Sequence, residues 1–134
     1  MIKPVAIDHL VLRTDQYREL IEFYCTVLGC ALERSTSAEF GLTQLRAGNA
    51  LIDIVDVDGE LGKVGGPAPG ATGNNLDHFC IQIEPFDEAE LIAYLKGHGV
   101  VVSEFAQRYG AQGMGRSLYL KDIAGNTVEL RSIL

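Results

Sequence analysis

The chain carries the same short pattern twice, and this internal repeat is the strongest constraint on its fold. An Ile-Asp-His sequence ending at His9 opens an apolar, strand-like run in the first half, and Leu-Asp-His ending at His78 opens another in the second. Late in each half an Ala-Gly-Asn turn precedes a further apolar strand that carries one acid, Asp53 or Glu129. A supersecondary unit that recurs in this way predicts two similar modules.

The elements expected in the first half follow from its periodicity. Apolar residues recur at helical spacing from Tyr17 to Leu28, with Thr14 or Asp15 as the N-cap and Gly29 as the C-terminal stop. The strand candidates are rich in β-branched and aliphatic residues and cover residues 5–12, 31–34, 40–46 and 51–57.

The second half repeats this order. Asp87, with Glu90 three residues later, resembles a capping box and begins a helix that stops at residues 97–99. The strand candidates of this half cover residues 76–83, 100–105, 117–121 and 127–133. The sequence therefore predicts an α+β fold of two tandem βαβββ modules, 5–57 and 76–133, within one domain, 1–134.

Two glycine-rich segments stand outside this pattern. Residues 58–75 also contain prolines and show no periodicity, so they are predicted to link the modules. Residues 109–115 do not lie between a strand and a helix, so they are not a dinucleotide fingerprint. They are predicted to form a plain connecting loop, with a mobile lid over a site as the alternative.

Composition excludes several classes of partner. The net charge is −7 and the 11 Lys and Arg residues are scattered, which argues against nucleic acid. No apolar stretch approaches the roughly 20 residues of a membrane span, and the N-terminal residues show neither the apolar core nor the small-residue cleavage site of a signal peptide. The three cysteines show no CxxC spacing and are expected to be reduced thiols. We therefore expect a cytoplasmic protein that binds neither nucleic acid nor membrane.

The repeated histidines and acids are the candidate chemistry. A lone histidine in a strand is more often packed or solvent-facing, but repetition at equivalent places favours a shared role for His9 and His78. Asp53 and Glu129 lie in apolar strands, where an unpartnered carboxylate is costly to bury. If the halves pack face to face, these four side chains can meet, and their nitrogen and oxygen atoms suit Zn²⁺, Ni²⁺, Co²⁺, Mn²⁺ or Fe²⁺.

One irregularity bears on Asp53. It follows Asn49 by four residues, whereas Glu129 follows Asn126 by three. Because strand side chains alternate between faces, an offset of one residue turns Asp53 away from the site. A longer turn or a β-bulge in the first hairpin restores it, and Asp56 is the weaker substitute.

Two further residues share a strand face with a histidine. Cys80 follows His78 by two residues and either lines the site or is a small buried hydrophobe. Arg13 follows His9 by four residues and either binds a substrate carboxylate or lies on the surface at the strand end.

Longer motifs resemble a known family. The sequence Ile-Asp-His-Leu-Val-Leu at 7–12, followed by Phe-Tyr-Cys-Thr-Val-Leu-Gly at 23–29, and the segment D-x-x-G-N-x-x-E-L at 122–130 resemble the vicinal oxygen chelate superfamily. This superfamily includes glyoxalase I, fosfomycin-resistance enzymes, bleomycin-resistance proteins and extradiol dioxygenases. The resemblance implies two curved half-barrel modules with one divalent metal ion between them.

A glyoxalase-like member is the best match, and the resemblance assigns roles to single residues. It implies that His9, Asp53, His78 and Glu129 are metal ligands and that Glu129 is also the catalytic base. Arg13 matches an arginine that holds a glutathione carboxylate in bacterial glyoxalase I. Two departures from the family pattern matter. Asp replaces the usual Glu at position 53, which gives a shorter reach to the metal ion. Val57 stands in place of an Asn that helps to hold glutathione, so the resemblance supports the metal site more than glutathione as the co-substrate.

Three functions are consistent with these residues. The first is a lactoylglutathione lyase-like enzyme that uses a metal ion to stabilise the enediolate of a small α-oxo or α-hydroxycarbonyl substrate. The second is a dioxygenase or fosfomycin-type transferase with three ligands, His9, His78 and Glu129. The third is a metal-free binding protein of the bleomycin-resistance type. A homodimer is expected, with the site formed within one chain or between two.

Overall fold

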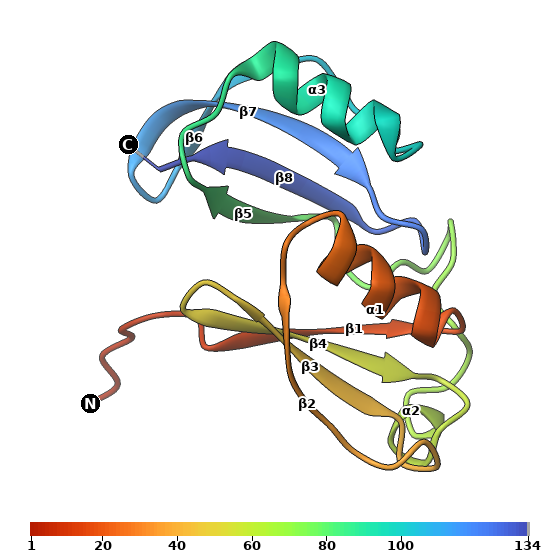
Figure 1. Cartoon of the computed structure of the whole chain (residues 1–134). Helices are drawn as coiled ribbons and strands as arrows, with labels where there is room; N and C mark the ends of the chain where they lie inside the picture. The colour runs from red at the N-terminus through yellow and green to blue at the C-terminus, as the bar shows by residue number, and fades with distance from the viewer. Residues whose placement is uncertain (134) are drawn as a thin grey trace. The chain divides into compact units, whose positions relative to one another are not determined.

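In the computed structural model, which describes residues 1–133, the chain divides into two compact units (Figure 1). They are the N-terminal unit, Met1–Gly73, and the C-terminal unit, Asn74–Leu134. The boundary falls inside the predicted linker, 58–75. Residue 134, the last of the predicted single domain, lies outside the described residues, and the single domain stays a prediction.

The N-terminal unit holds one four-stranded mixed sheet, in the order β1-β4-β3-β2. Strand β1 runs parallel to β4, and the other neighbours are antiparallel. Its elements are β1 (His9–Thr14), α1 (Tyr17–Thr26), β2 (Ala31–Ser35), β3 (Leu42–Ala47), β4 (Ala50–Asp56) and a short helix, α2 (Glu60–Lys63).

The C-terminal unit repeats this topology, with the sheet order β5-β8-β7-β6 and β5 parallel to β8. Its elements are β5 (Phe79–Ile83), α3 (Glu88–Gly97), β6 (Ala106–Gly110), β7 (Gly113–Lys121) and β8 (Thr127–Ser132). The order βαβββ therefore recurs in both units, which confirms the predicted fold class of tandem βαβββ modules.

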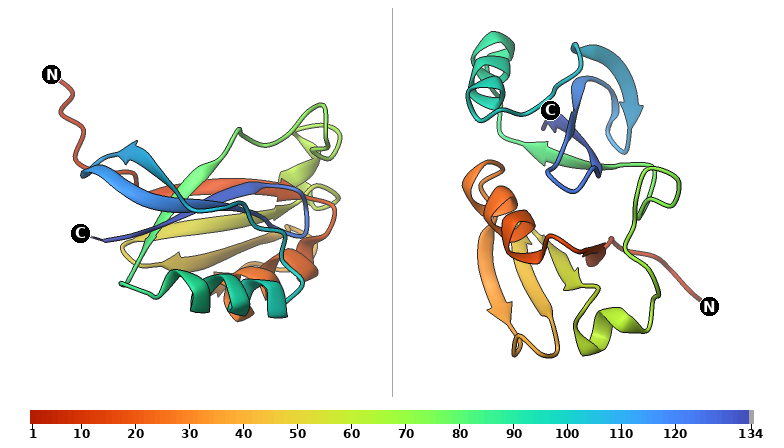
Figure 2. Two further views of the ribbon diagram at one scale, coloured as in Figure 1. Left: turned by 90° about the horizontal axis from the view of Figure 1, so that it is seen from above. Right: turned by 90° about the vertical axis from the view of Figure 1, so that its right-hand side faces the viewer.

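In each unit one sheet face packs against the helix (Figure 2). In the N-terminal unit Leu12 and Ile54 are Cα partners and are fully buried, as is Leu20 of α1. The Tyr17 hydroxyl of α1 is hydrogen-bonded to Thr43, which lies opposite Ile54 on the same face. Burying one aliphatic side chain contributes about 1.5–3 kcal/mol, so this apolar layer holds the helix in place.

The C-terminal unit has the same kind of core. Leu118 pairs with Leu130, and Leu120 pairs with Val128, which places all four on one face of the sheet. These residues are buried, as is Leu95 of α3. Because strand side chains alternate, the odd-numbered residues of β7 and β8 project from the opposite face. That second face carries the candidate site.

Two local predictions for the C-terminal unit are wrong. Residues 100–105 form no strand, apart from an isolated bridge between Val102 and Leu120. Residues 109–115 are not a loop, because Gly110 pairs with Gly113 across the tight turn of the β6–β7 hairpin. Two glycines of this hairpin, Gly110 and Gly115, leave space for the Arg131 side chain of β8.

The helix ends are partly as predicted. Asp87 caps α3, where its Oδ1 accepts a hydrogen bond from the Glu90 N–H (2.9 Å). In α1 the N-cap is Gln16 rather than Thr14 or Asp15, and Thr14 Oγ1 instead accepts a bond from the Gln16 N–H (2.8 Å). None of the helices within residues 1–133 has both the length and the apolar character needed to cross a membrane.

Candidate functional site

The first His–acid pair lies on the face of the N-terminal sheet that is turned away from α1. His9 begins β1, and Val11 is the Cα partner of Asp53 in the neighbouring strand β4. Asp53 is only 4% exposed. Its Oδ2 accepts a hydrogen bond from Gln44 Nε2 (3.1 Å), whereas its Oδ1 is buried and has no hydrogen-bond partner.

That unpartnered oxygen is unusual. Buried polar atoms in proteins are nearly always hydrogen-bonded. Among the residues that the structure describes, Asp53 Oδ1 is the only buried side-chain nitrogen or oxygen without a partner. A carboxylate that is held on one oxygen and left open on the other is suited to binding a cation.

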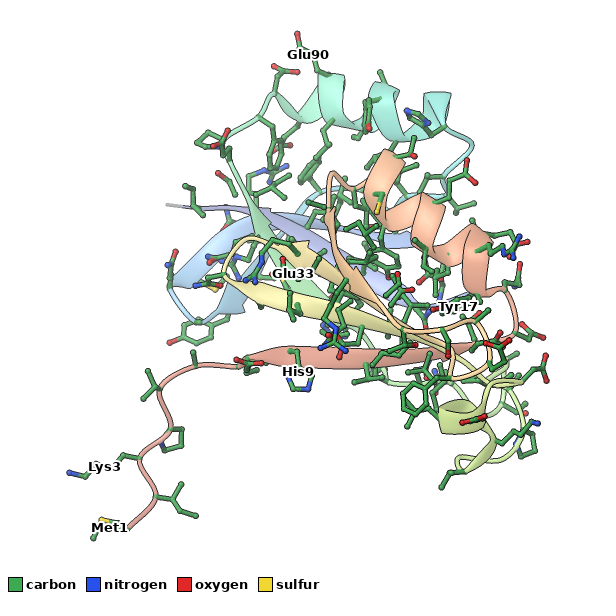
Figure 3. All side chains as sticks on the ribbon, turned by 60° about the horizontal axis from the view of Figure 1, so that its bottom comes forward. Met1, Lys3, His9, Tyr17, Glu33 and Glu90 are labelled. Carbon is green, nitrogen blue, oxygen red and sulfur yellow. The ribbon has the colours of Figure 1, made fainter. Side chains whose placement is uncertain are left out.

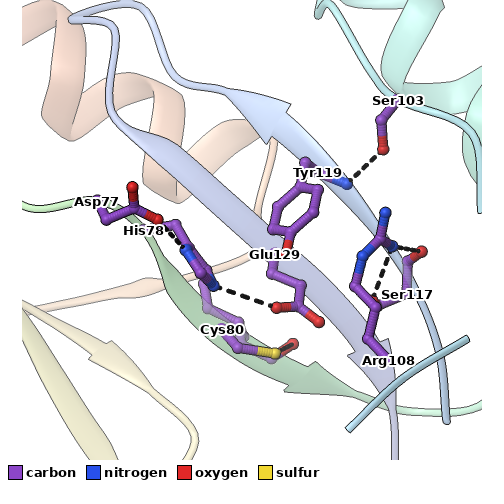
Figure 4. Close-up of polar contacts among 9 residues, drawn as sticks. Asp77, His78, Cys80, Ser103, Arg108, Ser117, Tyr119 and Glu129 are labelled. Carbon is purple, nitrogen blue, oxygen red and sulfur yellow. Dashed lines mark hydrogen bonds and ion pairs between the residues drawn. The ribbon is translucent and has the colours of Figure 1, made fainter. Parts of the chain in front are cut away.

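The second pair belongs to the C-terminal unit (Figure 4). His78 immediately precedes β5, and Cys80 is the Cα partner of Glu129 in β8. His78 Nε2 lies 3.5 Å from Glu129 Oε1, and the Glu129 side chain is 8% exposed. A histidine and a nearly buried carboxylate are therefore in contact within this unit.

The two pairs occupy the same register. In both units the acid lies opposite the residue two positions after the histidine, Val11 for Asp53 and Cys80 for Glu129. The β3–β4 pairing is continuous, so no bulge is needed to bring Asp53 onto the face of His9. Asp53 follows its Asn by four residues and Glu129 follows its Asn by three, because the β3–β4 turn is shorter than the β7–β8 turn.

Each imidazole is oriented by the residue before it. His9 Nδ1 lies 2.7 Å from Asp8 Oδ1, and His78 Nδ1 lies 2.6 Å from Asp77 Oδ2. His9 lies on β1 in Figure 3. A bond from Nδ1–H to a carboxylate selects the tautomer whose Nε2 has a free lone pair, which is the form that binds metals. The hydrogen bond with Asp8 raises the pKa of His9, desolvation opposes this, and the charge of Asp53 adds to it.

Aromatic and cationic side chains surround the second pair. Tyr119 of β7 is the Cα partner of Glu129, and its ring meets the His78 ring edge-on at 5.2 Å. The Arg108 guanidinium lies over the Tyr119 ring, 4.3 Å from its centroid. Sequence analysis missed both residues, because only the strand register shows that they share the face of Glu129.

Cys80 belongs to this face as well. It is an exposed free cysteine directly opposite Glu129, rather than a buried hydrophobe. Desolvation of the thiol and the charge of Glu129 raise the pKa of Cys80 to about 11, although Arg131 opposes the shift. The thiol is therefore protonated at neutral pH and a poor nucleophile.

Arg13 is hydrogen-bonded to α2 and to the loop that follows it. Its guanidinium donates to the carbonyl oxygens of Gly62 (3.0 Å), Gly66 (2.7 Å) and Pro67 (3.2 Å). These bonds tie the end of β1 to the loop, and a substrate-binding role for Arg13 stays a prediction. Asp56 lies opposite Thr14, on the helix side of the sheet, and its Oδ1 accepts a bond from the Asp58 N–H (2.9 Å).

Each unit thus contributes a pair rather than a complete ligand set. Within the described part of the chain, no three His, Cys, Asp or Glu side chains gather as a metal-binding group. The donor atoms of these residues, imidazole nitrogens and carboxylate oxygens, nevertheless suit a divalent cation. The imidazoles are oriented by carboxylates, and Asp53 offers a buried oxygen without a partner.

The comparisons with known proteins define the family. The model of the Glyoxalase/Bleomycin resistance protein/Dioxygenase superfamily matches residues 6–130, so the chain belongs to this superfamily. The resemblance seen in the sequence is thereby confirmed. No curated protein matches the chain.

Solved structures share the fold. An integron cassette protein from the mobile metagenome of V. Pseudocholerae is 27% identical, with a TM-score of 0.78 over 100% of this chain and 98% of that one. A corresponding cassette protein from V. Cholerae is 24% identical, with a TM-score of 0.78 over 100% and 99%. A lactoylglutathione lyase from Agrobacterium tumefaciens is 22% identical, with a TM-score of 0.68 over 96% and 94%.

Proposed function

We propose that this protein is a metal-dependent lyase or isomerase of the glyoxalase I type. Its substrate is a small α-oxo or α-hydroxycarbonyl compound, which includes the adduct of such a compound with a thiol. The proposed ligands of one divalent metal ion are His9, Asp53, His78 and Glu129. The observation that carries the proposal is the His–acid pair at identical register in both units, with each imidazole oriented by the preceding aspartate.

The chemistry of the donor set supports this proposal. A divalent ion, when bound, supplies Lewis acidity at the two vicinal oxygens of the substrate. Glu129 is our candidate for the base that removes the proton from the adjacent carbon. Its carboxylate is nearly buried and lies 3.5 Å from His78 Nε2, beside the nitrogen that would bind the metal ion.

Asp53 is suited to a different role. Gln44 restrains one of its oxygens, and the strand buries the side chain. A restrained carboxylate is a good ligand and a poor proton carrier, because it cannot follow the substrate. We therefore assign metal binding to Asp53, and both metal binding and proton transfer to Glu129.

Glutathione is not our preferred thiol. The family resemblance places an Asn at position 57 in enzymes that hold glutathione, whereas this chain has a buried Val57. The lactoylglutathione lyase of similar fold is only 22% identical to this chain. We propose that the glutathione adduct of methylglyoxal is a poor substrate, and that the enzyme is a cytoplasmic homodimer.

Metal titration is the first test. Chelator-treated protein is titrated by calorimetry with Zn²⁺, Ni²⁺, Co²⁺, Mn²⁺ and Fe²⁺, and about one ion per site is expected, with zinc-like distances of about 2.0–2.2 Å. His78→Ala and Glu129→Gln should each strongly weaken binding. His98→Ala is the matched control, because His98 is the third histidine and lies exposed at the end of α3. Unchanged affinity in the first two variants would overturn the ligand assignment.

A proton-exchange assay then tests the reaction. The metal-loaded protein is incubated in D₂O with methylglyoxal and a panel of thiols, and deuterium incorporation into the product is followed by NMR. Incorporation that depends on Glu129 supports proton removal by this residue. If Asp53→Ala leaves metal affinity unchanged, the three-ligand set of His9, His78 and Glu129 replaces the four-ligand one. If no ion binds, the metal-free binding protein becomes the better hypothesis.

A further inference from the structure

In the described part of the chain, two arginines on the face of Glu129 form no ion pair with a carboxylate. Arg108 lies in β6 and Arg131 in β8. By contrast, Arg46 forms an ion pair with Glu33, and Arg116 forms one with Glu88. In a chain with a net charge of −7, two arginines without an ion pair on one sheet face are unexpected.

Arg131 is held in a space that only glycines leave open. It is 4% exposed, and its Nη2 donates to the Gly113 carbonyl oxygen (3.0 Å). A Cβ atom at Gly110 or Gly115 would collide with its guanidinium nitrogens. The glycines of the β6–β7 hairpin therefore admit a buried positive charge, which is costly unless another group neutralises it.

Arg108 is more accessible and only partly used. Its Nη1 donates to both the backbone oxygen and the Oγ (3.1 Å) of Ser117. Among the described residues its hydrogen bonds come from Nη1 alone, which leaves Nε and Nη2 for another acceptor. Stacking over Tyr119 restricts the orientation of the guanidinium (Figure 4).

Both arginines contact the same part of β7, close to His78 and Glu129. Arg108 binds Ser117, the Cα partner of Arg131, and the Arg131 guanidinium packs on Gly115. Strand β7, which carries Tyr119, lies between β6 with Arg108 and β8 with Glu129. The Tyr119 ring contacts His78. An anion bound at Arg108 would therefore lie one aromatic ring from His78.

We propose that Arg108, backed by the buried charge of Arg131, is an anion-binding site that selects a substrate with a compact anionic group, a carboxylate or a phosphoryl group. The Nε and Nη2 donors of a guanidinium match two oxygens of such a group. The role of this site in selecting a substrate for Glu129 rests on the proposed function. Binding of the anion itself does not need a metal ion.

The test uses the full chain without metal and observes the arginine Nε–Hε signals by ¹H–¹⁵N NMR. The probes are pyruvate, its neutral ester methyl pyruvate, and inorganic phosphate. Pyruvate should shift the Arg108 signal and saturate, and methyl pyruvate should not. Tighter binding of phosphate than of pyruvate assigns the site to a phosphoryl group, and the reverse assigns it to a carboxylate.

Variants then locate the site. Arg108→Gln should weaken pyruvate binding about 10–100-fold, the range for loss of charge-assisted hydrogen bonds, and Arg108→Lys should retain part of it. Arg116→Gln is the control, because it removes the same charge from an arginine that is already paired with Glu88. Arg108 is half-exposed, so its replacement should leave the fold intact. The buried Arg131, whose replacement could unfold the protein, is left unchanged.

Three outcomes would overturn the inference: no saturable shift with pyruvate or phosphate, equal shifts with methyl pyruvate, or equal weakening by Arg116→Gln. The two proposals fail separately. Anion binding without any metal binding would sink the proposed function alone. Metal binding and proton exchange without anion binding would sink this inference alone.

Discussion

In the N-terminal unit the acid is Asp53, which Gln44 holds on one oxygen while the other has no partner. In the C-terminal unit the acid at the same register is Glu129, which contacts His78 and lies opposite Tyr119. The backbone places both acids alike, but a side-chain amide holds Asp53, whereas an imidazole contacts Glu129. This difference is the basis of the roles that we propose, metal binding for Asp53 and both metal binding and proton transfer for Glu129.

The units also differ in charge two residues further along. Val55 follows Asp53 in the N-terminal unit, and Arg131 follows Glu129 in the C-terminal unit. Both are buried, yet only Arg131 brings a positive charge to its sheet face. In our proposals, the duplicated fold keeps a ligand position in both copies and adds an anion-binding site to only one of them.

The largest expected effect separates the two acids. Glu129→Gln should lower kcat about 10²–10⁴-fold, because an amide cannot accept the proton. Asp53→Asn should weaken metal affinity and leave turnover at saturating metal far less affected. Steady-state kinetics at several metal concentrations measures both effects. Equal losses of kcat would show that the acids share one role.

A second pair of variants tests what supports each acid. Gln44→Leu should weaken metal affinity about 10–100-fold, because it removes the bond that orients Asp53. Tyr119→Phe should change metal affinity little, since the ring of Tyr119 contacts His78 and Arg108 and is kept in this variant. Calorimetry measures affinity, and thermal unfolding shows whether Gln44→Leu acts through stability instead. A larger effect from Tyr119→Phe would reverse the assignment.

The buried arginine predicts a stability difference. Gly115→Ala should lower the free energy of unfolding by about 1–3 kcal/mol, because the new methyl group overlaps the Arg131 guanidinium. Gly97→Ala, at the end of α3, meets nothing within 4 Å and should raise stability by about 0.5–1 kcal/mol or leave it unchanged. Urea unfolding measures both. A neutral Gly115→Ala would mean that Arg131 moves aside easily.

The smallest expected effect concerns the imidazoles. Asp8→Asn should lower the pKa of His9, because the hydrogen bond with Asp8 is the main cause of its upward shift. The raised folded-state pKa means that this interaction stabilises the fold fully below the unfolded value of about 6.5 and is lost as the pH rises through the folded value. NMR titration of the imidazole signals measures the change, with His78 as the internal control. An unchanged His9 pKa would contradict the orienting role of Asp8.

The strand predictions show which elements local sequence patterns can locate and which they cannot. The hydrophobic periodicity located α1, α3 and most of the strands, because these patterns depend on near neighbours in the chain. It wrongly assigned residues 100–105 to a strand, and it assigned residues 109–115 to a loop where the β6–β7 hairpin forms. Glycines are typical of turns, but Gly110 and Gly115 are needed for a contact with a distant strand.

The sequence by itself determined the two βαβββ modules, the family and the pairing of a histidine with an acid in each half, because the repeat and its periodicity are local. Only the tertiary structure decided that Asp53 lies on the face of His9. The register of β1 against β4 depends on hydrogen bonds between segments that are about 40 residues apart in the sequence. It also decided that Arg108 shares the face of Glu129, whereas Arg131 shares that face by strand alternation alone. Cross-strand neighbours are set by pairing, which no local pattern encodes.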